Sequence, residues 1–212
     1  MIVNRGFCKF FKRRENLKTK KKMKKSSKIV IVCLILLLFA VILFGPMQIQ
    51  NRILEIIYPR KFDNFVTLYA KEYQVDENLI YALIKAESNF EPSAVSGKDA
   101  KGLMQIVDET ALDVAKSLEM DISLEELSER LNEVDLNIQL GTKYISMLLE
   151  RYGNIPIALT AYNAGIGTVD NWIERDVIKA DGSDCENIPY RETNQYVRKI
   201  LRDYKIYQKL YG

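Results

Sequence analysis

An unbroken run of sixteen apolar residues, from Ile29 to Phe44, constrains this chain more than any other feature of its sequence. As an α-helix the run would be roughly 24 Å long, or about 28 Å if it continued to Met47, against a hydrocarbon core of ~30 Å. Twelve Lys and Arg residues and a single acidic residue precede it. An all-round apolar helix behind such a cluster of cations is typical of a membrane span rather than of a buried soluble helix. We therefore predict a transmembrane helix over 29–47.

A cleavable signal peptide is the alternative interpretation of this run. The run is longer than a usual signal core, and the residues from Gly45 to Gln48 offer no small-x-small cleavage site, so we predict a retained signal anchor. The positive-inside rule then predicts a basic cytoplasmic tail over 1–28 and places everything after residue 47 outside the cell membrane. A membrane-proximal stalk over 48–61 would lead to a domain over 62–212.

The amino-acid composition excludes several kinds of catalytic site, metal site and partner for that domain. The chain has no histidine, which excludes Ser-His-Asp and Cys-His catalysis and His-containing zinc sites. Its three cysteines are scattered, so no internal disulfide framework is expected. After Lys28 the chain holds 19 basic and 27 acidic residues, and this net charge of −8 argues against a nucleic-acid partner for the domain.

Apolar residues recur at helical spacing throughout the domain, which predicts a mainly α fold. About 150 residues are enough for one buried core. We expect a small irregular or hairpin segment between Pro92 and Ile106. The expected helices are Phe62–Tyr73, a helix capped by Asp76 and carrying Glu87, Glu109–Leu118 capped by Asp108, Leu124–Leu131 capped by Ser123, Leu136–Tyr152, a helix from Asn154 to Gly165, Thr168–Trp172, and a last helix from about Thr193.

Glu87 is the first candidate for chemistry. At helical spacing it shares one face with Ile80, Leu83 and Ile84, so its carboxylate ends an apolar stripe. Desolvation there would raise its pKa, which suits a general acid at neutral pH. The alternative is a helix-end glutamate whose carboxylate reaches water, the usual state of this residue type.

Three further segments differ from ordinary helix sequence. Taken alone each is weak, because Gly165 can be a helix C-cap and Tyr162 and Tyr196 can be core aromatics. The segments are Gly97–Gln105 with its Gly-Leu-Met-Gln, Ala161–Gly167 with its Ala-Tyr-Asn-Ala-Gly, and Ile188–Val197 with its Ile-Pro-x-x-Glu-Thr-x-x-Tyr-Val.

With Glu87-Ser88, in this order, these motifs resemble the catalytic domain of the soluble-type (SLT) lytic transglycosylases, within the goose-type-lysozyme-like superfamily. The resemblance covers roughly Phe62 to Leu210 and implies a lysozyme-like helical domain. One departure is visible: the family usually has a proline shortly after Met-Gln, and Val107-Asp108-Glu109 lacks it.

The resemblance implies non-hydrolytic cleavage of peptidoglycan glycan strands, with Glu87 as the catalytic residue. Glu87 would protonate the oxygen between N-acetylmuramic acid and N-acetylglucosamine, and the C6 hydroxyl would close a 1,6-anhydro ring. No metal or organic cofactor is implied. The residues implied to bind substrate are Ser88, Leu103, Met104, Gln105, Tyr162, Asn163, Glu192 and Tyr196.

Two other functions stay open at this point. A hydrolytic muramidase on the same fold would need a base such as Asp99 or Glu109 to activate water. A non-catalytic wall-binding component of an envelope-spanning machine would not need Glu87, so the presence of Glu87 argues against it.

Overall fold

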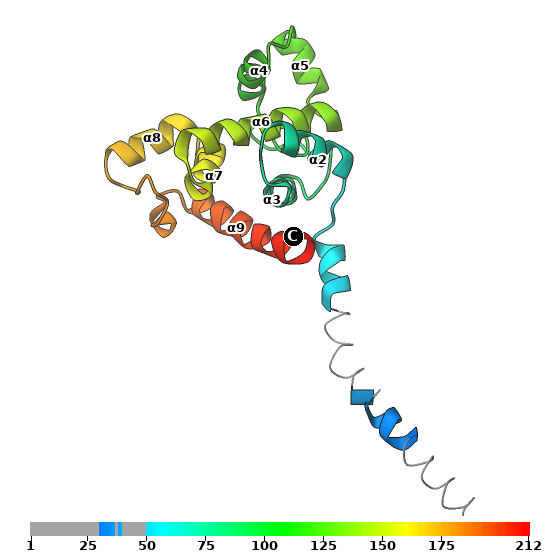
Figure 1. Cartoon of the computed structure of the whole chain (residues 1–212). Coiled ribbons are helices and arrows are strands. Elements are labelled where there is room, and N and C mark those ends of the chain that lie inside the picture. The colour runs from blue at the N-terminus through cyan, green and yellow to red at the C-terminus, as the bar shows by residue number, and fades with distance from the viewer. Residues whose placement is uncertain (1–29, 37, 40–49) are drawn as a thin grey trace, which may run out of the picture. The chain divides into compact units, whose positions relative to one another are not determined.

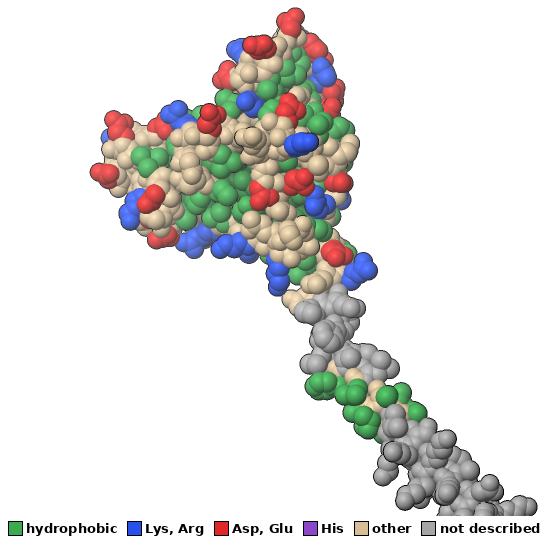
Figure 2. All heavy atoms as spheres, viewed as in Figure 1, with side chains coloured by type: hydrophobic (Ala, Val, Ile, Leu, Met, Phe, Trp, Pro, Cys, Tyr) green, Lys and Arg blue, Asp and Glu red, His purple; other side chains and the backbone are tan. Residues whose placement is uncertain are grey.

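The structure is a computed structural model that describes residues 30–36, 38–39 and 50–212 (Figure 1). The chain divides into two units, Met1–Ile56 and Ile57–Gly212. In the first unit residues 30–36 and 38–39 are helical, and their apolar side chains are exposed (Figure 2). Within the described ranges no helix is both long and apolar enough to cross a bilayer. The predicted tail 1–28 and the rest of the predicted anchor 29–47 lie outside the described residues, so the anchor stays a prediction.

The second unit is built from α-helices, which confirms the mainly α prediction. In the part of the chain that the structure describes there is no strand, only two isolated β-bridges. The elements are α2 (Asp63–Glu72), α3 (Glu77–Glu87), α4 (Asp108–Ser117), α5 (Leu124–Arg130), α6 (Val134–Tyr152), α7 (Ile155–Ala164), α8 (Ile166–Glu174), the 3₁₀ turn η1 (Cys185–Asn187) and α9 (Arg191–Tyr211).

Helix α3 lies at the centre of the domain. It packs against α2 and α9, and its six consecutive residues Leu79 to Ile84 are all buried (Figure 1). The predicted cap is confirmed, since Oδ1 of Asp76 accepts a hydrogen bond of 2.8 Å from the backbone N–H of Asn78. The helix ends at Glu87, so that side chain stands where the buried helix meets a loop.

The irregular segment before α4 is folded back on itself. Antiparallel bridges join Lys101 to Val95 and to Ile106, which is the reduced form of the hairpin that the sequence predicts. The predicted cap of α4 is wrong, because Asp108 is the first residue of the helix and Val107 precedes it. Instead the Asp108 carboxylate accepts hydrogen bonds from the Lys101 ammonium at 2.9 Å and from the Ser128 hydroxyl at 2.6 Å. The segment is thereby tied to both α4 and α5.

Some helices begin earlier than the sequence predicts. Helix α8 begins at Ile166 rather than Thr168, because Gly165, at φ 87°, turns the chain from α7 into α8 without a linker. Helix α9 begins at Arg191 rather than Thr193. The predicted stop of α6 is confirmed, with Gly153 in the left-handed region at φ 69°.

The chain enters the domain along the C-terminal end of α9. The hydroxyl of Tyr207 donates to the carbonyl of Pro59 at 3.0 Å, and that of Tyr211 donates to the carbonyl of Tyr58 at 2.9 Å. The Tyr58 ring meets the Tyr207 ring edge-on at 5.5 Å, and its hydroxyl donates to the buried Asp203 at 3.2 Å. Residues just before the predicted domain start at 62 therefore pack on the domain itself.

Candidate active site

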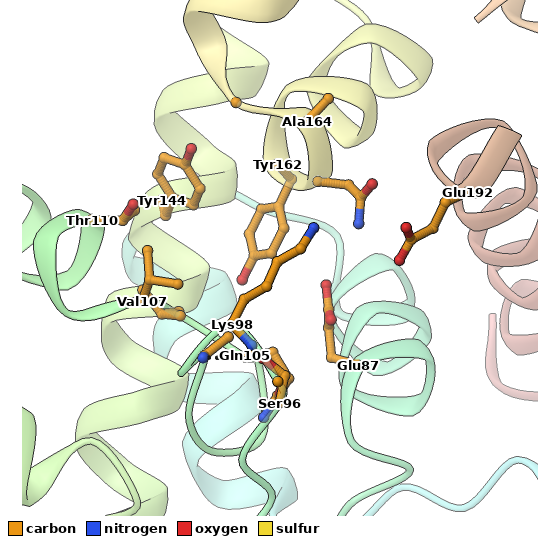
Figure 3. A pocket seen from close by; sticks show the side chains of 15 residues that line it. Glu87, Ser96, Lys98, Gln105, Val107, Thr110, Tyr144, Tyr162, Ala164 and Glu192 are labelled. Carbon is orange, nitrogen blue, oxygen red and sulfur yellow. Dashed lines mark hydrogen bonds between the residues drawn. The ribbon is translucent and has the colours of Figure 1, made fainter. Parts of the chain in front are cut away.

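A pocket of about 730 Å³ opens where the end of α3 meets the irregular segment, α6, α7 and the start of α9 (Figure 3). Segments distant in the sequence supply its walls. Its lining residues are Glu87, Ser96, Gly97, Lys98, Ala100, Gln105, Ile106, Val107, Thr110, Tyr144, Tyr162, Asn163, Ala164, Gly165 and Glu192.

Glu87 lies in one wall of this pocket with its carboxylate beside the Tyr196 hydroxyl. That hydroxyl donates a hydrogen bond of 2.5 Å to Oε1 of Glu87. Burial raises the pKa of Glu87 to about 7, although the bond from Tyr196 and the charge of Lys199 both act to lower it. A carboxyl with this pKa holds its proton for much of the time at neutral pH and can deliver it to a bound molecule.

Tyrosines form the neighbouring surface. The Tyr162 hydroxyl donates to the carbonyl of Met104 at 2.8 Å, and its ring lies 5.0 Å from the Tyr144 ring. Burial and the nearby Glu87 raise the pKa of both Tyr162 and Tyr196 well above the usual value. Both phenols therefore stay neutral and act as hydrogen-bond donors, so the carboxylate of Glu87 has a permanent donor at its side.

The Gly-Leu-Met-Gln motif splits between the core and the pocket. Leu103 and Met104 are fully buried, one layer behind the pocket wall, and the Met104 N–H donates to Oδ1 of Asn137 at 2.8 Å. Gln105 follows with a left-handed backbone at φ 48° and lines the pocket. Its side-chain amide donates to the carbonyls of Ala94 and Gly102, both at 2.9 Å. The two buried side chains thus fix the backbone that presents Gln105.

The remaining predicted residues fall into the same two layers. Ser88 donates to the carbonyl of Leu103 at 2.8 Å, while Oδ1 of Asn163 accepts from the Thr193 hydroxyl at 2.8 Å. Glu192 faces Glu87 from the far wall of the pocket (Figure 3). Of the predicted site residues, Glu87, Gln105, Tyr162, Asn163 and Glu192 line the pocket, whereas Ser88, Leu103, Met104 and Tyr196 stand behind it.

Sequence reasoning missed several lining residues. Ser96 and Lys98 belong to the irregular segment, in which the motif implied substrate binding only by the Leu-Met-Gln triplet. Thr110 and Tyr144 arrive from α4 and α6, and no local motif marks them. Tyr144 shares a helix face with the buried Leu140, Gly141 and Leu148, and this spacing is the signal that could have placed it on the inner side.

Comparison with known proteins places these motifs in a family. The model of the Transglycosylase SLT domain family matches residues 65–183. The chain is 31% identical over 161 residues to a soluble lytic murein transglycosylase of Salmonella typhimurium, covering 75% of this chain and 25% of that protein. It is 30% identical over 150 residues to the Escherichia coli protein of the same name, covering 70% of this chain and 23% of that one. The chain spans about a quarter of the length of these relatives.

Solved structures of lytic transglycosylases are also similar to this chain. An inactive Glu-to-Gln mutant of a lytic transglycosylase from Pseudomonas aeruginosa superposes with a TM-score of 0.65 at 34% identity, over 74% of this chain and 25% of that one. The 70-kDa soluble lytic transglycosylase in complex with bulgecin A superposes with a TM-score of 0.68 at 29% identity, over 75% of this chain and 26% of that one.

Proposed function

The chain belongs to the Transglycosylase SLT domain family, and we propose that it is a peptidoglycan lytic transglycosylase. It cleaves the β-1,4 bond between N-acetylmuramic acid and N-acetylglucosamine and leaves 1,6-anhydromuramic acid. The observation that carries this proposal is Glu87, a carboxyl with a pKa of about 7 in a pocket wall, hydrogen-bonded by Tyr196. The names of the relatives support it, and so does the solved relative in which a Glu-to-Gln mutation is described as inactive.

The reaction follows from the protonation state of Glu87. The protonated carboxyl gives its proton to the glycosidic oxygen, and the bond from that oxygen to C1 of the muramic acid breaks. The carbonyl oxygen of the substrate's 2-acetamido group stabilises the positive charge at C1. The Glu87 carboxylate, which accepts the hydrogen bond of the Tyr196 hydroxyl, then takes the proton of the C6 hydroxyl. As it does so, the C6 oxygen bonds to C1 and closes the 1,6-anhydro ring. Glu87 ends protonated and ready for another cycle.

Hydrolysis by the same pocket would need a group that activates water. The bases considered for this role, Asp99 and Glu109, are not among the residues that line the pocket. Ring closure needs no second base, because the Glu87 carboxylate takes the proton of the C6 hydroxyl, which the substrate itself supplies. Glu192, the second carboxyl group that lines the pocket, is the remaining candidate for a hydrolytic base, so the chemistry of the released products distinguishes the two reactions.

Mass spectrometry of the muropeptides released from purified peptidoglycan tests the proposal directly. The full chain should release products with anhydro ends, and Glu87→Gln should release at least 100-fold less, because general acid catalysis is typically worth 10²–10⁴-fold. Glu109→Gln is the matched control and should retain parental activity, since Glu109 is exposed and lies off the pocket. Products heavier by one water would identify a hydrolase, and an absence of products would refute catalysis on this substrate.

We also propose that the domain works outside the cell membrane, held by an N-terminal anchor over 29–47. The unbroken apolar run, the cations before it and the exposed apolar side chains at 30–36 and 38–39 support this arrangement. Protease treatment of intact cells should remove the domain and leave a membrane-bound fragment. Recovery of a soluble form beginning near Gln48 would show that the run is a cleaved signal peptide.

A further inference from the structure

The pocket holds a single cation. Among its lining residues, all of them within the described part of the chain, only Lys98 carries a positive charge, while Glu87 and Glu192 are acidic. The Lys98 side chain extends from the irregular segment into the pocket toward Tyr162 (Figure 3). No ion pair of the described residues includes the Lys98 ammonium. The neighbouring Lys101, in contrast, is fully engaged with Asp108 and Ser128.

A closed turn holds the backbone of Lys98 in place. The Ser96 N–H donates to the carbonyl of Ala100 at 2.9 Å, and the Ser96 hydroxyl accepts from the N–H of Lys98 at 3.2 Å and of Ala100 at 3.1 Å. Asp99, at the tip, takes the left-handed conformation at φ 56° that such a turn requires. The base of the lysine is therefore fixed, and its ammonium forms no ion pair with the described residues, which suits a group that pairs with a charge on an incoming molecule.

We propose that Lys98 binds a carboxylate of the glycan strand and makes the pocket selective for anionic strands over neutral ones. This rests on the function proposed above and names the feature of the substrate that the pocket recognises. A strand of this kind carries hydroxyl and acetamido groups, which are neutral, and its charge comes from carboxylates. The lactyl group of muramic acid supplies one when it is free, and a peptide attached to it supplies others.

The charges already in the pocket give the reason for such a cation. Two carboxyl side chains face the space that the strand must enter, so an anionic strand without a countercharge would be repelled when they are ionised. A pair between the Lys98 ammonium and a substrate carboxylate removes that repulsion and adds a charge-assisted hydrogen bond. A neutral polymer of N-acetylglucosamine gains nothing from the lysine.

Three matched strands test the proposal. The first has free lactyl carboxylates and no peptides, the second carries acidic peptides, and in the third every carboxyl group is capped as a methylamide. The preference is the ratio of kcat/KM for a charged strand to that for the capped strand. In the full chain Lys98→Met should lower this preference about tenfold, chiefly through KM, and Lys98→Arg should largely restore it. Lys71→Met is the control, because Lys71 is exposed on α2 and lies off the pocket.

The outcomes show which carboxylate Lys98 binds, and they distinguish a failure of this proposal from a failure of the proposed function. A loss confined to one of the two charged strands identifies the carboxylate that Lys98 binds. An unchanged preference in Lys98→Met, or an equal loss in Lys71→Met, overturns the proposal. Calorimetric binding of the three strands to Glu87→Gln, with and without Lys98→Met, repeats the comparison without catalysis. Failure of the parent to cleave any strand would refute the proposed function, and the binding ratios would still decide the role of Lys98.

Discussion

The Tyr196 hydroxyl donates its 2.5 Å hydrogen bond to Oε1 of Glu87 across 109 residues of sequence, joining the last residue of α3 to the first turns of α9. Two opposed effects meet at this carboxyl. Burial favours the protonated form, and the bond from Tyr196 favours the carboxylate that follows proton transfer. Their balance leaves the pKa at about 7, where both protonation states needed in the cycle are accessible.

Tyr196→Phe removes the hydrogen bond that favours the carboxylate form of Glu87. Because the hydrogen bond from Tyr196 lowers the pKa of Glu87, its loss should move that pKa above 7, and the decline of activity with rising pH should shift to higher pH. The rate at neutral pH should also fall by about tenfold, since the carboxylate loses a donor. The pH dependence of kcat measures both effects.

Tyr204→Phe is the control for this variant. Tyr204 lies on the same helix, but its hydroxyl donates to Asp76 at 2.6 Å, away from the pocket. Its pH profile should match that of the parent. If the profile of Tyr196→Phe is unshifted or moves to lower pH, the hydrogen bond does not hold down the pKa of Glu87.

Glu87→Gln should increase stability at neutral pH. The folded state holds the Glu87 proton more tightly than the unfolded chain, so ionisation costs folding free energy as pH rises above about 4.5, and the cost levels off above about 7. The variant removes this cost and should be about 3 kcal/mol more stable at pH 8, with the difference closing below pH ~4. Urea unfolding across this pH range measures it. A constant difference at all pH values would contradict the raised pKa.

Asn137→Ala should destabilise the fold strongly. Asn137 is fully buried, and its amide holds the N–H of Met104 and the carbonyls of Lys101 and Leu131 at 2.8–2.9 Å. Truncation leaves three buried polar groups without this partner and should cost about 2–4 kcal/mol in the free energy of unfolding. Asn171→Ala, at an exposed position of α8, should change that free energy by less than about 0.5 kcal/mol. Equal effects would mean that Asn137 does not support the loop.

Gly141→Ala should destabilise the protein even though alanine is the better helix former. An added Cβ would lie 2.4 Å from the sulfur of Met104, and such overpacking typically costs about 1–3 kcal/mol. Gly167→Ala is the matched substitution, because a Cβ at that position of α8 meets nothing within 4 Å. It should be neutral or stabilise by up to ~1 kcal/mol. Thermal unfolding of both variants checks the contrast: Gly141→Ala should lower the melting temperature, and Gly167→Ala should leave it unchanged or raise it.

The spacing of apolar residues predicts the helices and the candidate acid Glu87 well, because a helical repeat depends only on residues that are close in the sequence. Glu87 was found from its spacing to Ile80, Leu83 and Ile84, all of which are buried. The layer in which a side chain lies is not a local property. Leu103 and Met104 are apolar enough for a pocket wall and for a core, and the packing of α6 behind them decides for the core.

The same limit explains the residues that were missed or assigned a wrong role. Tyr144 reaches the pocket only because α6 crosses behind it, and Lys98 only because the irregular segment folds back. Asp108 has the side chain of a helix cap, yet the ammonium of Lys101 and the hydroxyl of Ser128 compete for its carboxylate. Each outcome depends on segments that meet in space and are far apart in the sequence.

The clasp of Tyr207 and Tyr211 on Pro59 and Tyr58 decides how the domain responds to mechanical tension. A pull on the chain before Tyr58 is resisted first at the end of α9, by three hydrogen bonds and the edge-on ring contact. The force reaches α9 at Tyr207 and Tyr211, both toward its C-terminal end, and it reaches α3 through the Lys85 ammonium, which lies 4.7 Å from the centre of the Tyr58 ring. A domain pulled at this end while bound to a rigid polymer can therefore yield first at its entry point, before the buried core around α3 unfolds.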